Sequence, residues 1–278
     1  MKVTLWGTRG SLASPGPDTA RYGGNTSCVE VRGSDGTVLV LDAGTGIRPL
    51  GKQLAGSVPR IDLLITHLHM DHIQGLGFFA PLRTPGVDVH IWGPASTTQT
   101  LWARLTRYLS PPLFPVHLRD LPCDLHLHEV PCAATQIGEF TVCSALICHP
   151  GPTVGFRITG PSGTLAYLPD HEPALGVRHF PQSEDWTSGF ELAKDADLLI
   201  HDAQYDSAEY KEHVGWGHSS LHDAVTFATL AGARHLVPFH HDPARTDSDL
   251  DLLISQTVAS QDSGFKITPA AEGATFEF

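Results

Sequence analysis

The sequence contains no apolar run near the roughly 18 to 20 residues that a membrane-spanning helix requires. Its N-terminus enters a strand-like pattern at once, without the apolar core and small-residue cleavage site of a secretory signal. The five cysteines are odd in number and include no Cys-x-x-Cys pair, so neither a disulfide framework nor a zinc ribbon is expected. These absences predict a cytoplasmic protein without a membrane segment.

Basic residues are scarce, because 18 Lys and Arg stand against 30 Asp and Glu, for a net charge of −12. A broad, non-specific surface for nucleic acid needs clustered Lys and Arg, so this balance argues against one. It does not exclude an anionic substrate, since bound divalent cations can reverse the local field. The 278 residues can bury a sizeable core and contain neither a linker nor a repeat, which predicts a single domain over 1–278.

Histidine is abundant, and four potential metal ligands fall within six residues. His67, His69, Asp71 and His72 follow an apolar run, 61–65, that predicts a buried strand ending at a sheet edge. His67 and His69 are two positions apart, so an extended backbone can aim both the same way. The adjacent Asp71 and His72 must point elsewhere, which suits a second ligand set. Imidazole and carboxylate without thiolate favour zinc, manganese or iron.

This His-x-His-x-Asp-His segment resembles the signature of metallo-β-lactamase-fold hydrolases. The resemblance covers most of the chain and implies an α/β (α+β) four-layer αββα sandwich, with metals at one edge of two facing sheets. Apolar patterning and turn residues predict the elements. We expect strands at 2–6, 28–32, 37–41, 61–65, 87–92, 139–147, 153–158, 164–168, 197–200, 235–239, 265–268 and 274–278. We expect helices at 47–54, just after residue 72, and at 96–109, 189–194, 221–231 and 247–259.

The resemblance also implies three more ligands. His149, at a strand end, matches the family's third ligand of the first metal, although such a histidine is often only a surface residue. Asp170 matches the acid that bridges both metals, with a turn acid as the alternative. His240 matches the last ligand, and His241 is the fallback. The implied sets for two divalent ions, Zn2+ or Mn2+, are His67, His69 and His149, and Asp71, His72 and His240, with Asp170 shared.

Two further segments are similar to the tRNA 3′-end-processing branch of the family. His201-Asp202 resembles its His-Glu-Ala-Thr motif and Gly217-His218 its Gly-His-Ser-Thr motif, which implies that Asp202 and His218 act together as a general acid. Asp replaces Glu here, so the pair is shorter by one methylene and its geometry is in question. A helix cap and a buried acid are the alternative explanation.

Three residues are candidates for supporting roles. Asp42 ends a predicted strand, and the resemblance implies that it supports the metal-binding histidines from behind, rather than being a solvated turn acid. The Gly-Gly-Asn-Thr-Ser segment around Asn25 looks like the corresponding segment of phosphodiesterase-type members, so Asn25 and Arg9 are candidates to contact either the substrate or the residues that support the metal ligands. Ordinary turn chemistry is the alternative. His126 and His128 give a weaker metal signal, explained more simply by exposed histidines on a strand.

The implied function is a dinuclear metal-dependent phosphodiesterase, in which a metal-bridging hydroxide attacks phosphorus and His218 protonates the leaving alkoxide. A small cyclic phosphate or nucleotide suits the acidic chain better than RNA, which favours a basic docking surface. Two alternatives stay open: an acyl-ester hydrolase acting on a lactone, thioester or β-lactam, and a metal-dependent binding protein without activity. The sequence leaves monomer and homodimer equally open.

Overall fold

The computed structural model describes residues 1–278 except 131–133, 174, 176–179, 181–182, 184–185 and 261–263. Its strands form two seven-stranded mixed sheets. In order across the first sheet they are β14 (Thr275–Glu277), β1 (Lys2–Gly7), β2 (Cys28–Arg32), β3 (Val38–Leu41), β4 (Arg60–Leu64), β5 (Asp88–Pro94) and β6 (Asp124–Val130). Across the second they are β13 (Lys266–Ile267), β12 (His235–Phe239), β11 (Leu198–Asp202), β10 (Gly163–Leu168), β9 (Val154–Gly160), β8 (Phe140–Leu146) and β7 (Thr135–Ile137).

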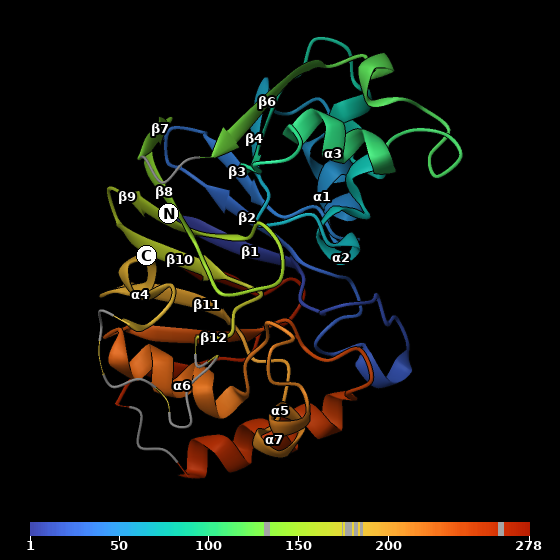
Figure 1. Cartoon of the computed structure of the whole chain (residues 1–278). Helices are drawn as coiled ribbons and strands as arrows, with labels where there is room; N and C mark the ends of the chain where they lie inside the picture. The colour runs from blue at the N-terminus through green and yellow to red at the C-terminus, as the bar shows by residue number, and fades with distance from the viewer. Residues whose placement is uncertain (131–133, 174, 176–179, 181–182, 184–185, 261–263) are drawn as a thin grey trace.

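Helices cover the outer face of each sheet (Figure 1). On the first sheet lie α1 (Ile47–Leu54), α2 (Met70–Ile73) and α3 (Leu101–Tyr108), and on the second lie α4 (Phe190–Ala193), α5 (Ser207–Glu212), α6 (Leu221–Leu230) and α7 (Asp247–Ser260). Short 3₁₀ turns occur at Pro17–Thr19, Leu76–Phe78, Ala80–Arg83 and Leu118–Asp120. None of the helices that the structure describes is long and apolar enough to cross a membrane.

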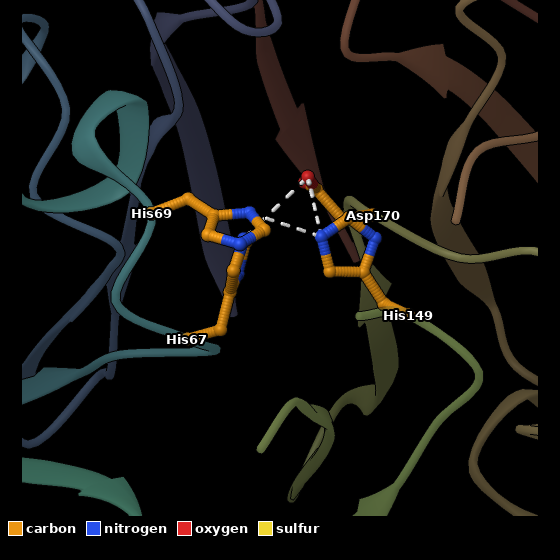
Figure 2. A group of neighbouring side chains, drawn as sticks. All are labelled: His67, His69, His149 and Asp170. Atoms are coloured by element: carbon orange, nitrogen blue, oxygen red, sulfur yellow. Dashed lines mark hydrogen bonds and ion pairs between the residues drawn. The ribbon is translucent and has the colours of Figure 1, made fainter. Parts of the chain in front are cut away.

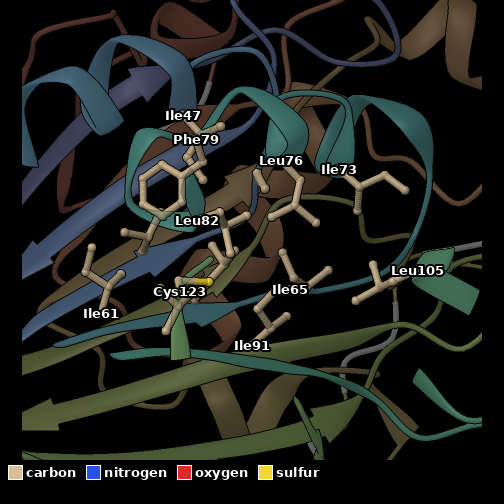
Figure 3. Packing of buried hydrophobic residues seen from close by; sticks show 14 of the residues in the cluster. Ile47, Ile61, Ile65, Ile73, Leu76, Phe79, Leu82, Ile91, Leu105 and Cys123 are labelled. Carbon is tan, nitrogen blue, oxygen red and sulfur yellow. The ribbon is translucent and has the colours of Figure 1, made fainter. Parts of the chain in front are cut away.

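Three apolar clusters account for these layers. One lies between the sheets and includes Val29, Leu39 and Tyr167. A second lies between the first sheet and its helices, where α1 contributes Ile47 and the adjoining turns contribute Phe79 (Figure 3). The third lies beneath α6 and α7. Because both faces of the first sheet are covered, residues 61–64 of β4 are buried, which explains the apolar Ile61, Leu63 and Leu64. The buried carboxylate between them, that of Asp62, pairs with Arg60.

The predicted αββα sandwich is confirmed, with local corrections. The helix expected over 96–109 begins only at Leu101, where the Thr100 side chain accepts a hydrogen bond from the Ala103 backbone N–H and caps it. The helix expected after residue 72 instead spans Met70–Ile73, so Asp71 lies within it. Helix α5 was not predicted, although Asp206 and Glu209 form a capping box at its start.

The strand directions bring distant segments to one edge of the sandwich. β3, β4 and β5 run parallel in the first sheet, and β10, β11 and β12 run parallel in the second. The carboxyl ends of parallel strands meet at the same edge of a sheet, so the loops that follow them gather there. A hydrogen bond from the Val154 backbone N–H to the Thr66 carbonyl oxygen, 2.9 Å long, joins the two sheets at this edge.

Candidate metal centre and acid pair

The first candidate ligand group joins three loops. His67 and His69 follow β4, His149 follows β8 and Asp170 follows β10, and each offers a ligand atom within 4.8 Å of the others. His149 Nε2 lies 3.1 Å from His69 Nδ1 and 3.7 Å from Asp170 Oδ2. Figure 2 shows the rings and the carboxylate pointing toward one another. Such spacings suit an ion with metal–ligand bonds of about 2 Å.

The second candidate group shares Asp170 with the first. His72 Nε2 lies 2.9 Å from Asp170 Oδ1 and 3.3 Å from Asp71 Oδ2. His240 Nε2 lies 3.2 Å from Asp170 Oδ1 and 3.1 Å from Asp71 Oδ2. Asp170 therefore presents Oδ1 to this group, whereas its Oδ2 lies on the side of His67 and His149, an arrangement suited to a carboxylate that bridges two ions.

Oxygen acceptors behind the site fix the orientation of three of these rings. In each case Nδ1 faces an oxygen, so Nδ1 carries the proton and the Nε2 lone pair is left facing the group. The contacts are His72 Nδ1 to Asp42 Oδ2 at 2.8 Å, His149 Nδ1 to the Gly217 carbonyl oxygen at 2.8 Å, and His240 Nδ1 to Gln204 Oε1 at 3.0 Å.

Asp42 lies behind the ligand loop, the segment 66–72 that carries His67, His69, Asp71 and His72, as the resemblance implied. Its Oδ1 accepts a hydrogen bond from the Thr66 backbone N–H at 2.8 Å, and its Oδ2 accepts one from the Tyr167 hydroxyl at 3.0 Å. Asp42 also has a φ of 59°, a conformation uncommon for residues other than glycine. Its carboxylate thus ties His72 to the backbone that carries the ligand loop.

The charge environment differs between the two groups. Burial, reinforced by the neighbouring His72, holds the pKa of His67 well below its usual range, and burial also lowers the pKa of His69 and His149. These rings are therefore neutral, as a metal ligand must be. Burial alone would lower the pKa of His72, but the carboxylates around it, Asp170 foremost, raise that pKa well above its usual range. The carboxylates of the second group thus stabilise a positive charge placed among them.

Two buried atoms test whether these residues suit a metal. His67 Nε2 and Asp170 Oδ1 are buried and have no hydrogen-bond partner within the described parts of the chain. A buried polar atom left unpaired costs about 1–3 kcal/mol, so such atoms are normally paired. Divalent cations in the two groups would satisfy both atoms, and the nitrogen and oxygen donors suit zinc or manganese. The donor set fits divalent metal binding.

Asp202 and His218 form an ion pair beside these groups. His218 Nδ1 lies 2.6 Å from Asp202 Oδ2, and the His218 ring stacks on His240 with centroids 4.9 Å apart. Burial lowers the pKa of His218, but the Asp202 carboxylate outweighs it and raises the pKa to about 9. Aspartate in place of glutamate therefore still reaches the imidazole, because Asp202 ends β11 directly behind the 217–220 segment.

Glu172 is a residue of the site that the sequence analysis missed. Its side chain is buried, and it accepts hydrogen bonds from the backbone N–H groups of Gly215, at 2.8 Å, and Gly217, at 2.7 Å. It therefore holds the segment that carries His218. The only signal in the sequence was its position two residues after Asp170.

Arg9 and Asn25 are both engaged in hydrogen bonds inside the protein. The Arg9 side chain is fully buried and donates hydrogen bonds to the carbonyl oxygens of Gly23, Asp242 and Arg245. Asn25 Nδ2 donates to Glu272 Oε2 at 2.9 Å, and its backbone N–H donates to Glu272 Oε1. These contacts join loops near the site and agree with the supporting role, whereas contact with substrate stays a prediction.

The structure also separates His240 from His241. His240 joins the second ligand group, with a φ of 60° that turns its ring inward. His241 is buried on the other side, with Nε2 2.8 Å from the Ala270 carbonyl oxygen. His240 is therefore the candidate ligand.

A family model described as the beta-lactamase superfamily domain matches residues 37–241, which include every candidate ligand. The chain belongs to this superfamily. The resemblance to metallo-β-lactamase-fold hydrolases is thereby confirmed. The chain is also 31% identical over 262 residues to a ribonuclease Z of Mycobacterium sp. strain KMS, covering 87% of this chain and 85% of that one.

Solved structures show the same fold. Human tRNase Z, short form, aligns with a TM-score of 0.68 at 23% identity, over 100% of this chain and 99% of that one. A diphosphatase from the PhnP family aligns with a TM-score of 0.69 at 19% identity, over 100% of this chain and 96% of that one. At these identities the likeness establishes the metallo-β-lactamase fold alone.

Proposed function

We propose that this protein is a dinuclear metal-dependent phosphodiesterase. The observation that carries the proposal is the Asp202–His218 pair, with its 2.6 Å contact, placed beside two ligand groups that share Asp170. Hydrolysis of a phosphodiester expels an alkoxide, which is a poor leaving group until it is protonated. A histidine poised to donate a proton at the edge of a metal site supplies that need. The likeness to a ribonuclease Z supports this choice.

In this proposal, one ion is held by His67, His69 and His149 and the other by Asp71, His72 and His240, with Asp170 contacting both. When bound, the two ions supply an activated water and offset the negative charge that develops on the phosphoryl oxygens. The outer hydrogen bonds from Asp42, Gly217 and Gln204 hold the ligand rings ready, so that little reorganisation accompanies binding.

His218 donates the proton to the departing oxygen. Its Nδ1–H points to Asp202, which fixes the ring and leaves Nε2 as the atom that can face a substrate. Asp202 itself is fixed by the backbone N–H groups of Gln204 and Ser219, 3.1 and 3.0 Å away, so it cannot turn aside. Divalent cations in the two ligand groups would repel an imidazolium and so oppose the Asp202 carboxylate, which raises the pKa of His218.

A small phosphodiester, such as a cyclic phosphate or a nucleotide, is the proposed substrate class. The net charge of −12 disfavours long-range attraction of a polyanion such as RNA. Two arginines near the site, Arg9 and Arg245, are already engaged inside the protein: Arg9 binds three carbonyl oxygens, and Arg245 pairs with Glu209. Neither arginine is therefore expected to bind the phosphates of a nucleic acid.

A parallel activity screen tests the proposal. The protein, loaded with zinc or with manganese, is assayed against bis-p-nitrophenyl phosphate, cyclic nucleotides and short RNA, and against a thioester, a lactone and a β-lactam. We expect turnover of the phosphodiesters well above that of the acyl substrates, and loss of it in His67→Ala. Turnover confined to the acyl substrates would identify an acyl hydrolase, and inactivity toward all of them despite metal uptake would identify a binding protein.

A further inference from the structure

The edge of the first sheet carries a second concentration of histidine and aspartate. Strands β5 and β6 are parallel neighbours, and β6 is the outermost strand of the sheet. Their register places Asp88 opposite Asp124, His90 opposite His126, and Trp92 opposite His128. Alternate residues of a strand share one face, so all six side chains stand on the same face of this strand pair.

Three of these side chains converge on one point. Asp88 Oδ1 lies 3.0 Å from His90 Nε2 and 3.4 Å from His126 Nε2, and the three ligand atoms lie within 4.8 Å of one another. Four ligand atoms placed tetrahedrally around a zinc ion at bond lengths of about 2 Å lie roughly 3.3 Å from one another. The two short separations match this ligand-to-ligand distance.

The oxygen at the centre of this arrangement has no donor. Asp88 Oδ1 is buried, and no group in the described parts of the chain donates a hydrogen bond to it, although the two imidazole nitrogens lie close. The nearest guanidinium, that of Arg60 opposite Asp88 in the register, instead donates to both carboxylate oxygens of Asp62, at 2.8 and 2.9 Å. Asp88 also faces the like charge of Asp124 across the strands. A cation would satisfy the oxygen and relieve the repulsion.

His128 sets the orientation of His90. His90 Nδ1 lies 2.8 Å from His128 Nε2, and the two rings stack with centroids 5.0 Å apart. The Nε2 of His128 can accept this hydrogen bond when the His128 proton is on Nδ1. When Nδ1–H of His90 donates to it, the lone pair on Nε2 of His90 is directed at the Asp88 oxygen. This is the outer-shell arrangement that orients metal-binding histidines.

We propose that Asp88, His90 and His126 bind a divalent transition-metal ion such as Zn2+. The ion would join the edge strand β6 to β5. The His126 side chain is about half exposed, which leaves room for water to complete the coordination. Two imidazoles and one carboxylate suit zinc, nickel or copper rather than calcium or magnesium.

This edge site is separate from the candidate metal centre. Asp88 pairs in register with Arg60, the first residue of β4, whereas the ligand loop that carries His67 follows the last residue of that strand. The two sites therefore lie at opposite ends of β4. Loss of the edge ion leaves the central ligands in place. The edge-site proposal and the proposed function can therefore each be contradicted while the other stands.

Zinc counting tests the edge site. The metal-free full-length protein is equilibrated with zinc chloride, and bound zinc per chain is measured by elemental analysis for wild type, His126→Gln, Asp88→Asn and His117→Gln. We expect His126→Gln and Asp88→Asn each to bind one ion fewer than wild type, and His117→Gln, which removes a histidine outside the site, to bind as many as wild type. Asp170→Asn, which alters only the centre, should keep the edge ion.

A second measurement does not depend on stoichiometry. In long-range proton–nitrogen NMR spectra of the histidine rings, zinc should shift the Nε2 signals of His90 and His126, which the variants assign, and leave the His117 signals in place. Circular dichroism and the melting temperature in a chelator establish that each variant is folded. Equal zinc content in His126→Gln and wild type, or unshifted Nε2 signals, would overturn the proposal and leave Asp88 in contact with the two histidines alone.

Discussion

The Glu172 carboxylate accepts a 2.7 Å hydrogen bond from the Gly217 backbone N–H, across 45 residues of chain. The carbonyl oxygen of Gly217 in turn accepts the Nδ1–H of His149, and the next residue is His218. Gly217 has a φ of 88°, and a Cβ there would lie 2.3 Å from the His149 ring, so only glycine fits. Glu172 is thus a positioning residue for both a candidate ligand and the candidate acid.

Glu172→Gln should weaken this support without changing side-chain size. The amide must turn an NH2 group toward backbone N–H donors, which leaves at least one buried donor unpaired. Loss of an outer-shell partner typically lowers metal affinity or activity about 10–100-fold. We expect a fall of that size in kcat/KM and in the zinc affinity of the centre. The matched control is Tyr210→Phe, which removes a hydroxyl donor to Glu172 but leaves the Gly217 contact. Equal effects of the two variants would contradict the positioning role.

His218→Asn should separate substrates by their leaving group. Without the acid, a cyclic nucleotide must expel an unprotonated alkoxide, so its turnover should fall about 10²–10⁴-fold. Bis-p-nitrophenyl phosphate expels a stabilised phenolate and should lose far less. Asp202→Asn should follow the same pattern, because its amide no longer stabilises the imidazolium. An equal loss on both substrates would show that His218 contributes by a route other than proton donation.

Removal of single ligands should reveal the two-group arrangement by metal content. His149→Ala should lose the ion of the first group and His240→Ala that of the second, whereas Asp170→Ala should weaken both, because Asp170 belongs to each group. Elemental analysis in a His126→Gln background keeps the proposed edge ion out of the count. His117→Ala is the control. A wild-type content of a single ion would rule out the dinuclear centre.

The sequence allowed prediction of the elements whose pattern reflects local burial. The run 61–65 is apolar except for the buried Asp62 because both faces of β4 are covered, and the ligands are recognisable because they cluster at strand ends. Contacts between distant segments were not predictable in the same way. Glu172 acts on residues 43 and 45 positions away, and nothing in its own neighbourhood specifies them. The burial of Arg9 was not predictable because arginines are mostly exposed, and only the assembled loops supply the carbonyl oxygens that bury it.

Arg9→Lys tests the structural role assigned to Arg9. A lysine keeps the charge but cannot donate in the directions of three carbonyl oxygens, which leaves buried acceptors unpaired. We expect a loss of about 2–4 kcal/mol in the free energy of unfolding, measured in urea, with KM unchanged. Arg21→Lys is the control, since the Arg21 pair with Asp251 is exposed and screened by solvent. A raised KM with an unchanged free energy of unfolding would show instead that Arg9 contacts the substrate.

His235 should make stability depend on pH. Its Nε2 lies 2.9 Å from Thr268 Oγ1, and burial, with a smaller contribution from Lys266, lowers its pKa to about 4. The unfolded chain has a histidine pKa of about 6.5, so between these values the unfolded state binds more protons. The stabilisation is therefore complete above about pH 6.5 and is lost as the pH falls toward 4.

Urea unfolding in the presence of a chelator measures this dependence at pH 7 and pH 4.5. In His235→Gln, the loss of stability between these pH values should be smaller than in wild type by about 1 kcal/mol, a figure reduced for the solvent around the half-buried ring. His117→Gln, which removes a histidine outside both proposed sites, is the matched control, and its pH dependence should follow that of wild type. If the pH dependence of His235→Gln also follows that of wild type, the folded environment does not lower the pKa of His235. The packing of β12 against β13, which buries this ring and disfavours its protonated form, would then be contradicted.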